Sequence, residues 1–142
     1  MILRVKTKRW DDPRQADDGF RLLVCRYRPR AVAKDAETWD AWWKELGPSV
    51  ALHAAAYGKE GQPLIAWADY EELYEAEMRQ PAPARKIAWL ARSVVSGEPL
   101  TLLCSSACVD ASRCHRTLLH RLIERAATGE GSTTGRKRPS TS

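Results

Sequence analysis

The feature that most constrains the fold is a short apolar run that ends in a cysteine and leads into a loop and a helix. Leu100–Cys104 contains a single polar residue, and five residues are too few for a stable helix, so the run predicts a buried β-strand. After a loop of nine residues, Cys114 stands where apolar residues begin to recur at helical spacing. A strand, a loop and a helix in this order bring side chains to a crevice, where the free N–H groups of the helix start favour a thiolate or an anion.

The remaining apolar patterns predict an α/β fold. The predicted strands are residues 3–6, 20–25 and 100–104, and the predicted helices are residues 35–46, 67–78, 87–95 and 114–126. The first of these helices is predicted from an N-cap at Asp35 and from four apolar positions at helical spacing, Trp39, Trp42, Trp43 and Leu46. One further strand is expected within residues 49–57. Strands that lead into helices favour a single three-layer domain, with a small, mainly parallel sheet flanked by helices.

Length and composition indicate one domain with a short tail. A chain of 142 residues can bury a substantial core. Residues 1–128 are assigned to the α/β domain, whereas residues 129–142 offer no apolar side chain to bury and are expected to form a disordered basic tail. No apolar run approaches the roughly 20 residues of a membrane span or the core of a signal peptide. A cytoplasmic location and free thiols at the four cysteines are therefore expected.

Charge is distributed unevenly along the chain. Residues 1–34 carry ten Arg or Lys and four acidic residues, residues 35–80 carry three and ten, and residues 81–128 carry seven and three. If the two basic blocks meet in the fold, the crevice between them is electropositive. That arrangement favours an anionic small molecule or a nucleotide as ligand, and nucleic acid is a second possibility. The alternative is that the charges simply scatter over the surface.

The cysteine segment and several upstream residues resemble the DUF488 family. Its members carry a cysteine at the end of a late strand and a Cys-His-Arg triplet at the start of the next helix, positions held here by Cys104 and by Cys114, His115 and Arg116. The upstream matches are Arg26, Pro29, Arg30 and Lys34 in an Arg-x-x-Pro-Arg-Gly-x-x-Lys loop, Asp40 and Trp42 running on to Pro48 and Ser49, and Tyr74 with Glu77. The resemblance covers nearly the whole predicted domain and implies an α/β fold with a site at the triplet.

Three positions depart from the family pattern. Ser106 stands where relatives commonly have an acidic residue, Arg28 where they have tryptophan, and Ala31 where they have glycine. If the absent carboxylate acts as a base or a metal ligand in relatives, this protein is altered or inactive.

Three residues are predicted to carry the chemistry: Cys114, His115 and Cys104. A helix N-terminus and nearby cations lower the pKa of a thiol, so Cys114 is expected to be the nucleophilic or redox thiol, and burial as a packing residue is the alternative. His115 is expected to act as an acid or base, or else to anchor the loop. Cys104 could pair with Cys114 in a redox couple or pack as a small apolar residue. Cys108 fits a C-x4-R anion loop and ranks below Cys114.

Six further residues are predicted to bind the ligand: Arg26, Arg30, Lys34, Ser49, Ser106 and Arg116. Arginine suits bidentate contact with a phosphate group, although ion pairing with the acidic middle block is an alternative. Neither a metal nor a cofactor is expected, because the cysteine spacing matches no common zinc module. The leading hypothesis is a protein that binds a phosphate-containing or other anionic ligand beside the Cys114 thiol. The alternatives are a non-catalytic nucleic-acid or protein-binding module and a Cys-based redox or metal-binding protein. The sequence leaves catalysis and oligomeric state open.

Overall fold

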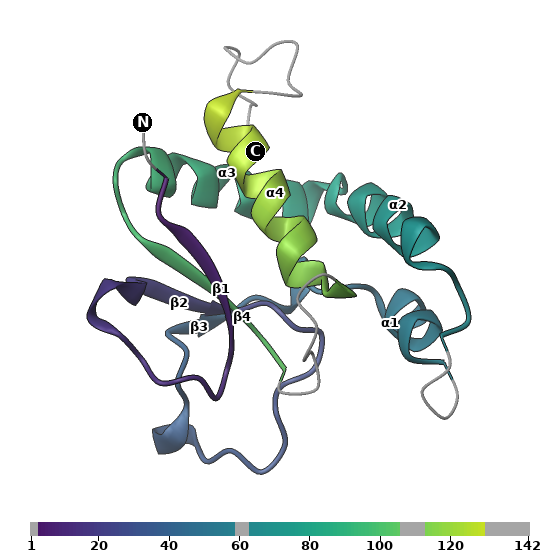
Figure 1. Ribbon diagram of the computed structural model, residues 1–142, viewed down its shortest axis with the longest axis horizontal. Coiled ribbons are helices and arrows are strands. Elements are labelled where there is room, and N and C mark those ends of the chain that lie inside the picture. The colour runs from purple at the N-terminus through teal and green to yellow at the C-terminus, as the bar shows by residue number, and fades with distance from the viewer. Residues whose placement is uncertain (1–2, 59–62, 106–112, 130–142) are drawn as a thin grey trace.

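Four parallel strands form a sheet against which four α-helices pack (Figure 1). The computed structural model describes residues 3–58, 63–105 and 113–129. The strands are β1 (Val5–Arg9), β2 (Phe20–Leu23), β3 (Ala41–Trp42) and β4 (Leu100–Cys104), in the order β1-β4-β2-β3. The predicted α/β class and parallel sheet are confirmed. The strands that were expected to begin at residues 3 and 20 correspond to β1 and β2.

The helices are α1 (Val50–Tyr57), α2 (Trp67–Met78), α3 (Pro81–Val95) and α4 (His115–Thr128). The predictions for α2, α3 and α4 are confirmed, and α3 begins six residues before the predicted start because Pro81 and Pro83 are tolerated in the first turn of a helix. None of the helices in the described ranges has the length and apolar character needed to cross a membrane. The predicted tail lies, from residue 130 onward, outside the described residues.

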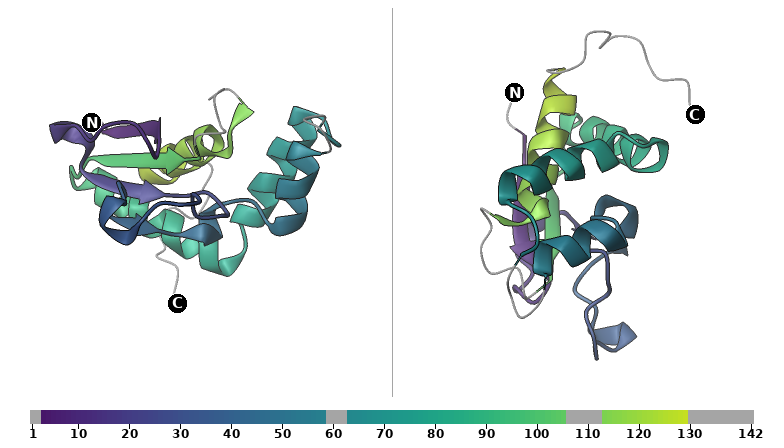
Figure 2. Two further views of the ribbon diagram at one scale, coloured as in Figure 1. Left: turned by 90° about the horizontal axis from the view of Figure 1, so that it is seen from below. Right: turned by 90° about the vertical axis from the view of Figure 1, so that its right-hand side faces the viewer.

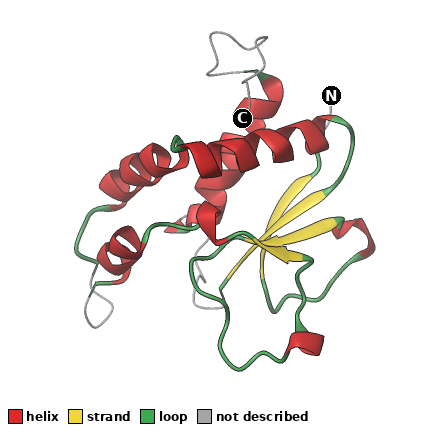
Figure 3. Cartoon of the chain, turned by 180° about the vertical axis from the view of Figure 1, so that it is seen from behind, coloured by secondary structure: helices red, strands yellow, loops and turns green. Residues whose placement is uncertain are grey.

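One face of the sheet carries the main core. Leu22 and Leu102 project from the two central strands against Leu90 of α3 and Leu119 of α4, and all four side chains are at least 99% buried. Figures 1 and 3 show the α-helices gathered on this side of the strands. All five residues of β4 are buried, as expected for a strand paired on both edges.

The opposite face is covered by connecting segments. Leu23 and Leu103 pack there with Trp39, and Trp10 and Trp42 are partly buried against the same cluster. Trp39 contacts the edge of Trp10, with ring centroids 6.1 Å apart. Figure 2 shows the strands side by side, with α1 and α2 extending beyond one end of the sheet.

A buried carboxylate anchors this second face. Asp18 and Arg21 are both fully buried and form an ion pair of 2.6 Å. Lys6 and Lys8 lie two residues apart on β1, so both side chains leave the same face of the strand, and their Nζ atoms reach Asp18 at 2.6 and 2.9 Å. Arg21 Nε also donates to the carbonyl of Thr38 at 2.7 Å. The cluster therefore joins β1, β2 and two connecting segments.

A glycine is required where the chain enters β2. Gly19 has φ +64°, and a Cβ atom at this position would lie 2.3 Å from the carbonyl oxygen of Pro99. That oxygen accepts a hydrogen bond from the backbone N–H of Phe20 at 3.1 Å, which continues the pairing of β2 with the segment before β4. Close backbone approach and positive φ both favour glycine here.

The helix predicted over residues 35–46 is wrong. The segment contains a 3-10 helix at Lys34–Ala36, the short strand β3 and a second 3-10 helix at Lys44–Leu46. The prediction assigned Trp42 and Trp43 to one face of a helix, but the two side chains lie on opposite faces of the sheet. Trp42 packs against the cluster beneath the connecting segments, and Trp43 packs against the main core on the helix side. This segment pairs with the edge of β2 through hydrogen bonds such as that from Trp43 N to the carbonyl of Leu23, 3.0 Å. Sheet pairing of this kind overrides the local helix propensity of the segment.

The strand expected within residues 49–57 is also wrong, because these residues form α1. Ser49 is the N-cap, and its side chain accepts a hydrogen bond from the backbone N–H of Leu52 at 3.1 Å. Residues 54–56 are all alanine, the strongest helix former, and they favour a helix over a strand in this segment. The fourth strand of the sheet is β3 instead.

We expect Asp18→Asn to destabilise the fold by about 3–5 kcal/mol at neutral pH, because it leaves the buried Arg21 charge without compensation. Burial by itself raises the pKa of Asp18, but hydrogen bonds from the two lysines, the Gln15 backbone and Arg21 outweigh burial and hold the pKa well below 3.8. Since the folded-state pKa is lower than the unfolded-state value, this stabilisation is complete above the ordinary pKa and is lost as the pH falls toward the folded value.

Urea unfolding of both proteins from pH 7 to pH 3 measures this effect. Wild-type stability should fall more steeply below about pH 4 than that of the variant. Asp17→Asn is the control, because Asp17 is largely exposed and solvent screens its pair with Lys6, so this change should have little effect on stability. Equal losses in the two variants would contradict a central role for Asp18.

Candidate functional site

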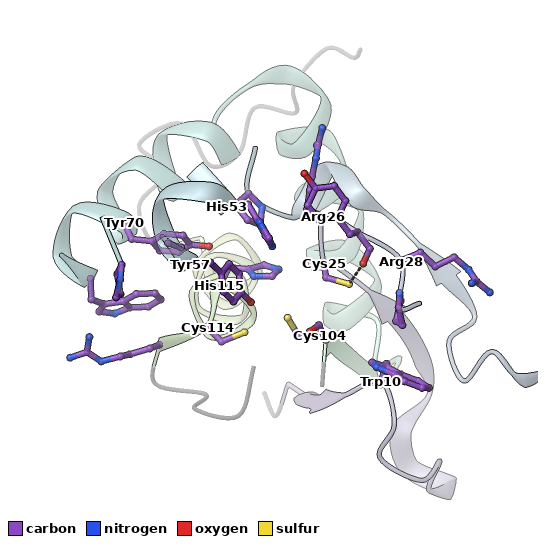
Figure 4. A pocket seen from close by; sticks show the side chains of 18 of the residues that line it. Trp10, Cys25, Arg26, Arg28, His53, Tyr57, Tyr70, Cys104, Cys114 and His115 are labelled. Atoms are coloured by element: carbon purple, nitrogen blue, oxygen red, sulfur yellow. Dashed lines mark hydrogen bonds between the residues drawn. The ribbon is translucent and has the colours of Figure 1, made fainter. Parts of the chain in front are cut away.

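A cavity of about 630 Å³ opens where the carboxyl end of β4 meets the start of α4 (Figure 4). Its walls come from the segment after β2, from α1, from the start of α2 and from the residues that flank β4 and α4. The carboxyl ends of parallel strands meet at one edge of a sheet, and ligands of open α/β folds bind in the crevice outside that edge. The topology therefore places the cavity where such folds place their sites.

Cys104, Cys114 and His115 form a buried cluster in the cavity. One ligand atom from each residue, a sulfur or a ring nitrogen, lies within 4.8 Å of those of the other two. The three residues are 1%, 2% and 6% exposed. Figure 4 shows both sulfur atoms directed into the space beside the His115 ring. The sequence placed these residues on a strand end and a helix start, and the fold brings them into contact range.

A backbone carbonyl fixes the orientation of His115. Its Nε2 lies 2.8 Å from the carbonyl oxygen of Val24. Because that oxygen can only accept, Nε2 carries the hydrogen, and in the neutral ring Nδ1 then holds the lone pair. His115 was expected either to anchor a loop or to act as an acid or base, and this hydrogen bond is compatible with both roles. It anchors the segment after β2, and it leaves the lone pair of the neutral ring on Nδ1.

Cys114 occupies the N-cap position of α4. Its backbone is extended, and its carbonyl accepts the first hydrogen bond of the helix, from Thr117 N at 3.1 Å. The thiol therefore lies at the positive end of the helix dipole, as the sequence predicted. Behind the cluster, Tyr74 is completely buried, and burial, together with its neighbours Tyr70, Cys114 and Cys104, raises its pKa well above 10. Its phenol stays neutral and donates to the carbonyl of Leu46 at 2.7 Å.

Arginines line the wall of the cavity. Arg26, Arg30 and Arg113 contribute to the lining and form no ion pair with any other described residue. Arg28 also lines it, but its guanidinium is engaged by Glu37 at 2.6 Å and lies 5.3 Å from the ring centre of Trp39. Among the described residues, the cavity lining therefore combines a thiol cluster with an excess of positive charge.

Three other predicted ligand-binding residues within the described ranges, Arg116, Ser49 and Lys34, do not line the cavity. Arg116 is buried and donates from Nη1 to the carbonyl of Lys8 at 2.7 Å, which ties α4 to β1. Ser49 caps α1, and Lys34 is exposed at the start of a 3-10 helix. Ser106 and Cys108 lie outside the described residues.

Two further residues of the family pattern, Glu77 and Trp42, support the segments that surround the cavity. Glu77 of α2 accepts hydrogen bonds from the backbone N–H and the hydroxyl group of Ser49, and so holds the start of α1. Gly47 passes so close to the preceding loop that a Cβ atom would lie 2.7 Å from the backbone nitrogen of Arg26. On the other side, Trp42 Nε1 donates to the carbonyl of Cys25 at 2.9 Å. These contacts fix the loop that carries the cavity arginines.

An aromatic wall was missed by the sequence reasoning. His53 and Tyr57 of α1 and Trp67 and Tyr70 of α2 line the cavity, as does Tyr27 from the segment after β2. His53 and Tyr57 are four residues apart and therefore share a helix face, which would have been recognised had residues 49–57 been predicted as a helix. Trp67 and Tyr70 were identified only as part of an apolar helix stripe.

Comparisons with known proteins give a family and one curated relative. Residues 5–127 match the family DUF488-N3a, described as the active DUF488-N3 subclade. The chain is 34% identical over 105 residues to the uncharacterized protein YeaO of Escherichia coli strain K12, and the match covers 73% of this chain and 84% of the relative. No solved structure matches the chain significantly.

The loop that carries Arg30 contains a strained residue. Ala31 has φ +59° at the position where the family pattern has glycine. Because a left-handed conformation costs an L-residue about 1–2 kcal/mol, partly offset by the greater unfolded-state freedom of glycine, we expect Ala31→Gly to stabilise the protein by about 0.5–1 kcal/mol.

Chemical denaturation at neutral pH measures this difference. Ala33→Gly is the matched control, because Ala33 has an ordinary φ of −66° in the same loop and the change should destabilise the protein slightly. A loss of stability in Ala31→Gly equal to that of the control would show that the loop is not strained at Ala31.

Proposed function

The chain belongs to the DUF488-N3a family, and we propose that it binds a phosphate-containing or other anionic ligand in its cavity, beside a reactive thiol at Cys114. The observation that carries the proposal is the buried cluster of Cys104, Cys114 and His115 in a cavity lined by Arg26, Arg30 and Arg113. The arginines and the thiols suit one site, because cations stabilise both a thiolate and a bound anion.

The roles of the three cluster residues follow from their positions. Cys114, at the N-cap of α4, is the thiol that ionises, because the N–H groups of the first helical turn favour a negative charge. His115 accepts the thiol proton on Nδ1, while Val24 holds the opposite side of the ring. Cys104 places a second thiol within 4.8 Å of the Cys114 sulfur.

Arg30 and Arg26 are the anion-binding residues in this proposal. Both come from the segment that follows β2, and neither is neutralised by a carboxylate among the described residues, unlike Arg28. Arg113, next to Cys114, contributes a third guanidinium. Guanidinium groups form bidentate hydrogen bonds with phosphate oxygens and keep their charge at all physiological pH values.

Thiol alkylation on the native protein tests the proposal. We expect Cys114 to react with iodoacetamide well below pH 8.5, the ordinary thiol pKa, and inorganic phosphate to slow this reaction. Peptide mass spectrometry over a pH series gives the rate for each cysteine separately. In Arg30→Ala, protection by phosphate should weaken by roughly tenfold, the effect of losing a charge-assisted hydrogen bond.

The control for this experiment is Arg85→Ala, which removes an exposed arginine of α3 away from the cavity and should leave protection unchanged. Cys25 serves as the internal reference thiol, because its sulfur already donates to the carbonyl of Tyr27 at 3.0 Å. The proposal fails if Cys114 titrates like Cys25 or if phosphate protects Arg30→Ala as well as wild type.

A second candidate function, a metal centre, is favoured by the compactness of the same cluster. Two cysteines and one histidine are a known ligand set for catalytic zinc, which keeps a fourth position for water or substrate. For two cysteines and one histidine, tetrahedral zinc bond lengths place the ligand atoms about 3.5–3.8 Å apart. The observed limit of 4.8 Å therefore requires them to approach by at most about 1 Å. The carbonyl of Val24 would then orient His115 as an outer-shell partner.

Metal analysis separates the two candidates. If the cluster is a zinc site, protein purified without chelator and equilibrated with zinc sulfate should retain about one zinc per chain by elemental analysis. Cys104→Ser and His115→Asn should each abolish that retention, whereas Cys25→Ser should not. Wild-type protein without bound zinc after dialysis would exclude this second function and leave the thiol proposal in place.

A further inference from the structure

The cavity has an aromatic side as well as a basic one. Tyr27 and Tyr57 are 52% and 44% exposed although both are large aromatic residues. His53 lies between them, with ring centroids 5.0 Å from Tyr27 and 4.5 Å from Tyr57. All three residues line the cavity. Aromatic surface left open at a concave site indicates a binding function more often than a packing one.

The aromatic residues and the cysteines occupy different parts of the cavity. Figure 4 shows His53, Tyr57 and Tyr70 on one side of the two cysteine sulfurs, and Trp10 and Arg28 on the other. Further along the aromatic side, Trp67 stacks on Tyr70 with ring centroids 4.8 Å apart. A ligand that fills the cavity therefore meets aromatic rings, guanidinium groups and thiols together.

We infer that the ligand is a nucleotide, whose base stacks on Tyr27, His53 and Tyr57 while its phosphate meets Arg26 and Arg30. This inference rests on the proposed function, because it adds a base site to the anion site described above. Every nucleobase presents a π-face, so stacking on tyrosine and histidine binds bases with little dependence on their identity.

The size of the cavity supports this ligand class. A volume of about 630 Å³ lies within the range of roughly 300–1,000 Å³ found for organic ligands, and it is far larger than a bare phosphate ion needs. An anion alone would leave the aromatic side of the cavity in contact with water. A nucleotide fills both sides and brings its phosphate and sugar toward the cysteine cluster.

The chain connectivity also couples the base and phosphate sites. Tyr27 lies between Arg26 and Arg28 in the same loop, and Gly47 holds that loop against the turn that begins α1. α1 in turn carries His53 and Tyr57 and is fixed by the bonds between Ser49 and Glu77. The arginines and the aromatic rings therefore lie on two segments, the loop after β2 and α1 with the turn before it, and these segments contact each other directly.

Calorimetric titration of the full chain with matched probes tests the inference. The probes are AMP, the other three ribonucleoside 5′-monophosphates, ribose 5-phosphate and adenosine, all at one ionic strength. We expect AMP to bind at least about tenfold more tightly than ribose 5-phosphate, the size of effect that stacking of one base gives. Arg30→Ala should weaken AMP and ribose 5-phosphate by the same factor.

Variants of Tyr57 distinguish stacking from general apolar contact. Tyr57→Leu should lower AMP affinity by roughly tenfold and leave ribose 5-phosphate unchanged, whereas Tyr57→Phe should retain the AMP affinity. Trp89→Leu is the control, because Trp89 is a similarly exposed aromatic residue of α3 outside the cavity. Tyr27→Leu repeats the test from the other segment and should also lower AMP affinity.

The outcomes separate the base site from the anion site. Equal affinities for AMP and ribose 5-phosphate, or an AMP affinity that survives both leucine variants, would overturn the nucleotide inference and leave the proposed anion site standing. Binding of adenosine as tight as that of AMP, with no binding of ribose 5-phosphate, would support the base site and refute the anion site. No binding by any probe would refute both.

Discussion

The buried position of β4 is the constraint on which the rest of the structure depends. The strand pairs with β1 along one edge and with β2 along the other, so every one of its residues is removed from water and its register is fixed on both sides. Because all strands run in parallel, Cys104 at its carboxyl end lies beside the segment that leaves β2. The start of α4 returns to the same edge, and the cluster of two thiols and an imidazole follows from that geometry.

Much of the family pattern stabilises the scaffold rather than touching the cavity. Tyr74 and Glu77 of α2 hold Leu46 and Ser49, which fixes the turn before α1. Arg116, the third member of the Cys-His-Arg triplet, ties α4 to β1 through the carbonyl of Lys8. Some residues of the family pattern thus face the cavity, and the others stabilise the segments that surround it.

The sequence predicted the elements whose evidence is local. The strand Leu100–Cys104, the helices α2, α3 and α4, and the position of Cys114 at a helix start all follow from apolar spacing over a few residues. The prediction for residues 35–46 was wrong because three tryptophans at helical spacing also satisfy a segment that crosses a sheet edge. Nothing local distinguishes Trp42, which packs on one face, from Trp43, which packs on the other.

The sequence alone therefore determined the α/β class, because strands and helices are indicated by apolar spacing over a few residues. Its resemblance to the DUF488 family also indicated Cys104, Cys114 and His115, which the fold brings into one cluster. Only the tertiary structure decided which cations join them. Arg26 and Arg30 line the cavity, whereas Arg116 turns away to a backbone carbonyl and Arg28 is engaged by Glu37. It also brought His53 and Tyr57 to the same cavity. Which side chains line the cavity depends on packing between segments that are far apart in the chain, and local residue patterns do not predict that packing.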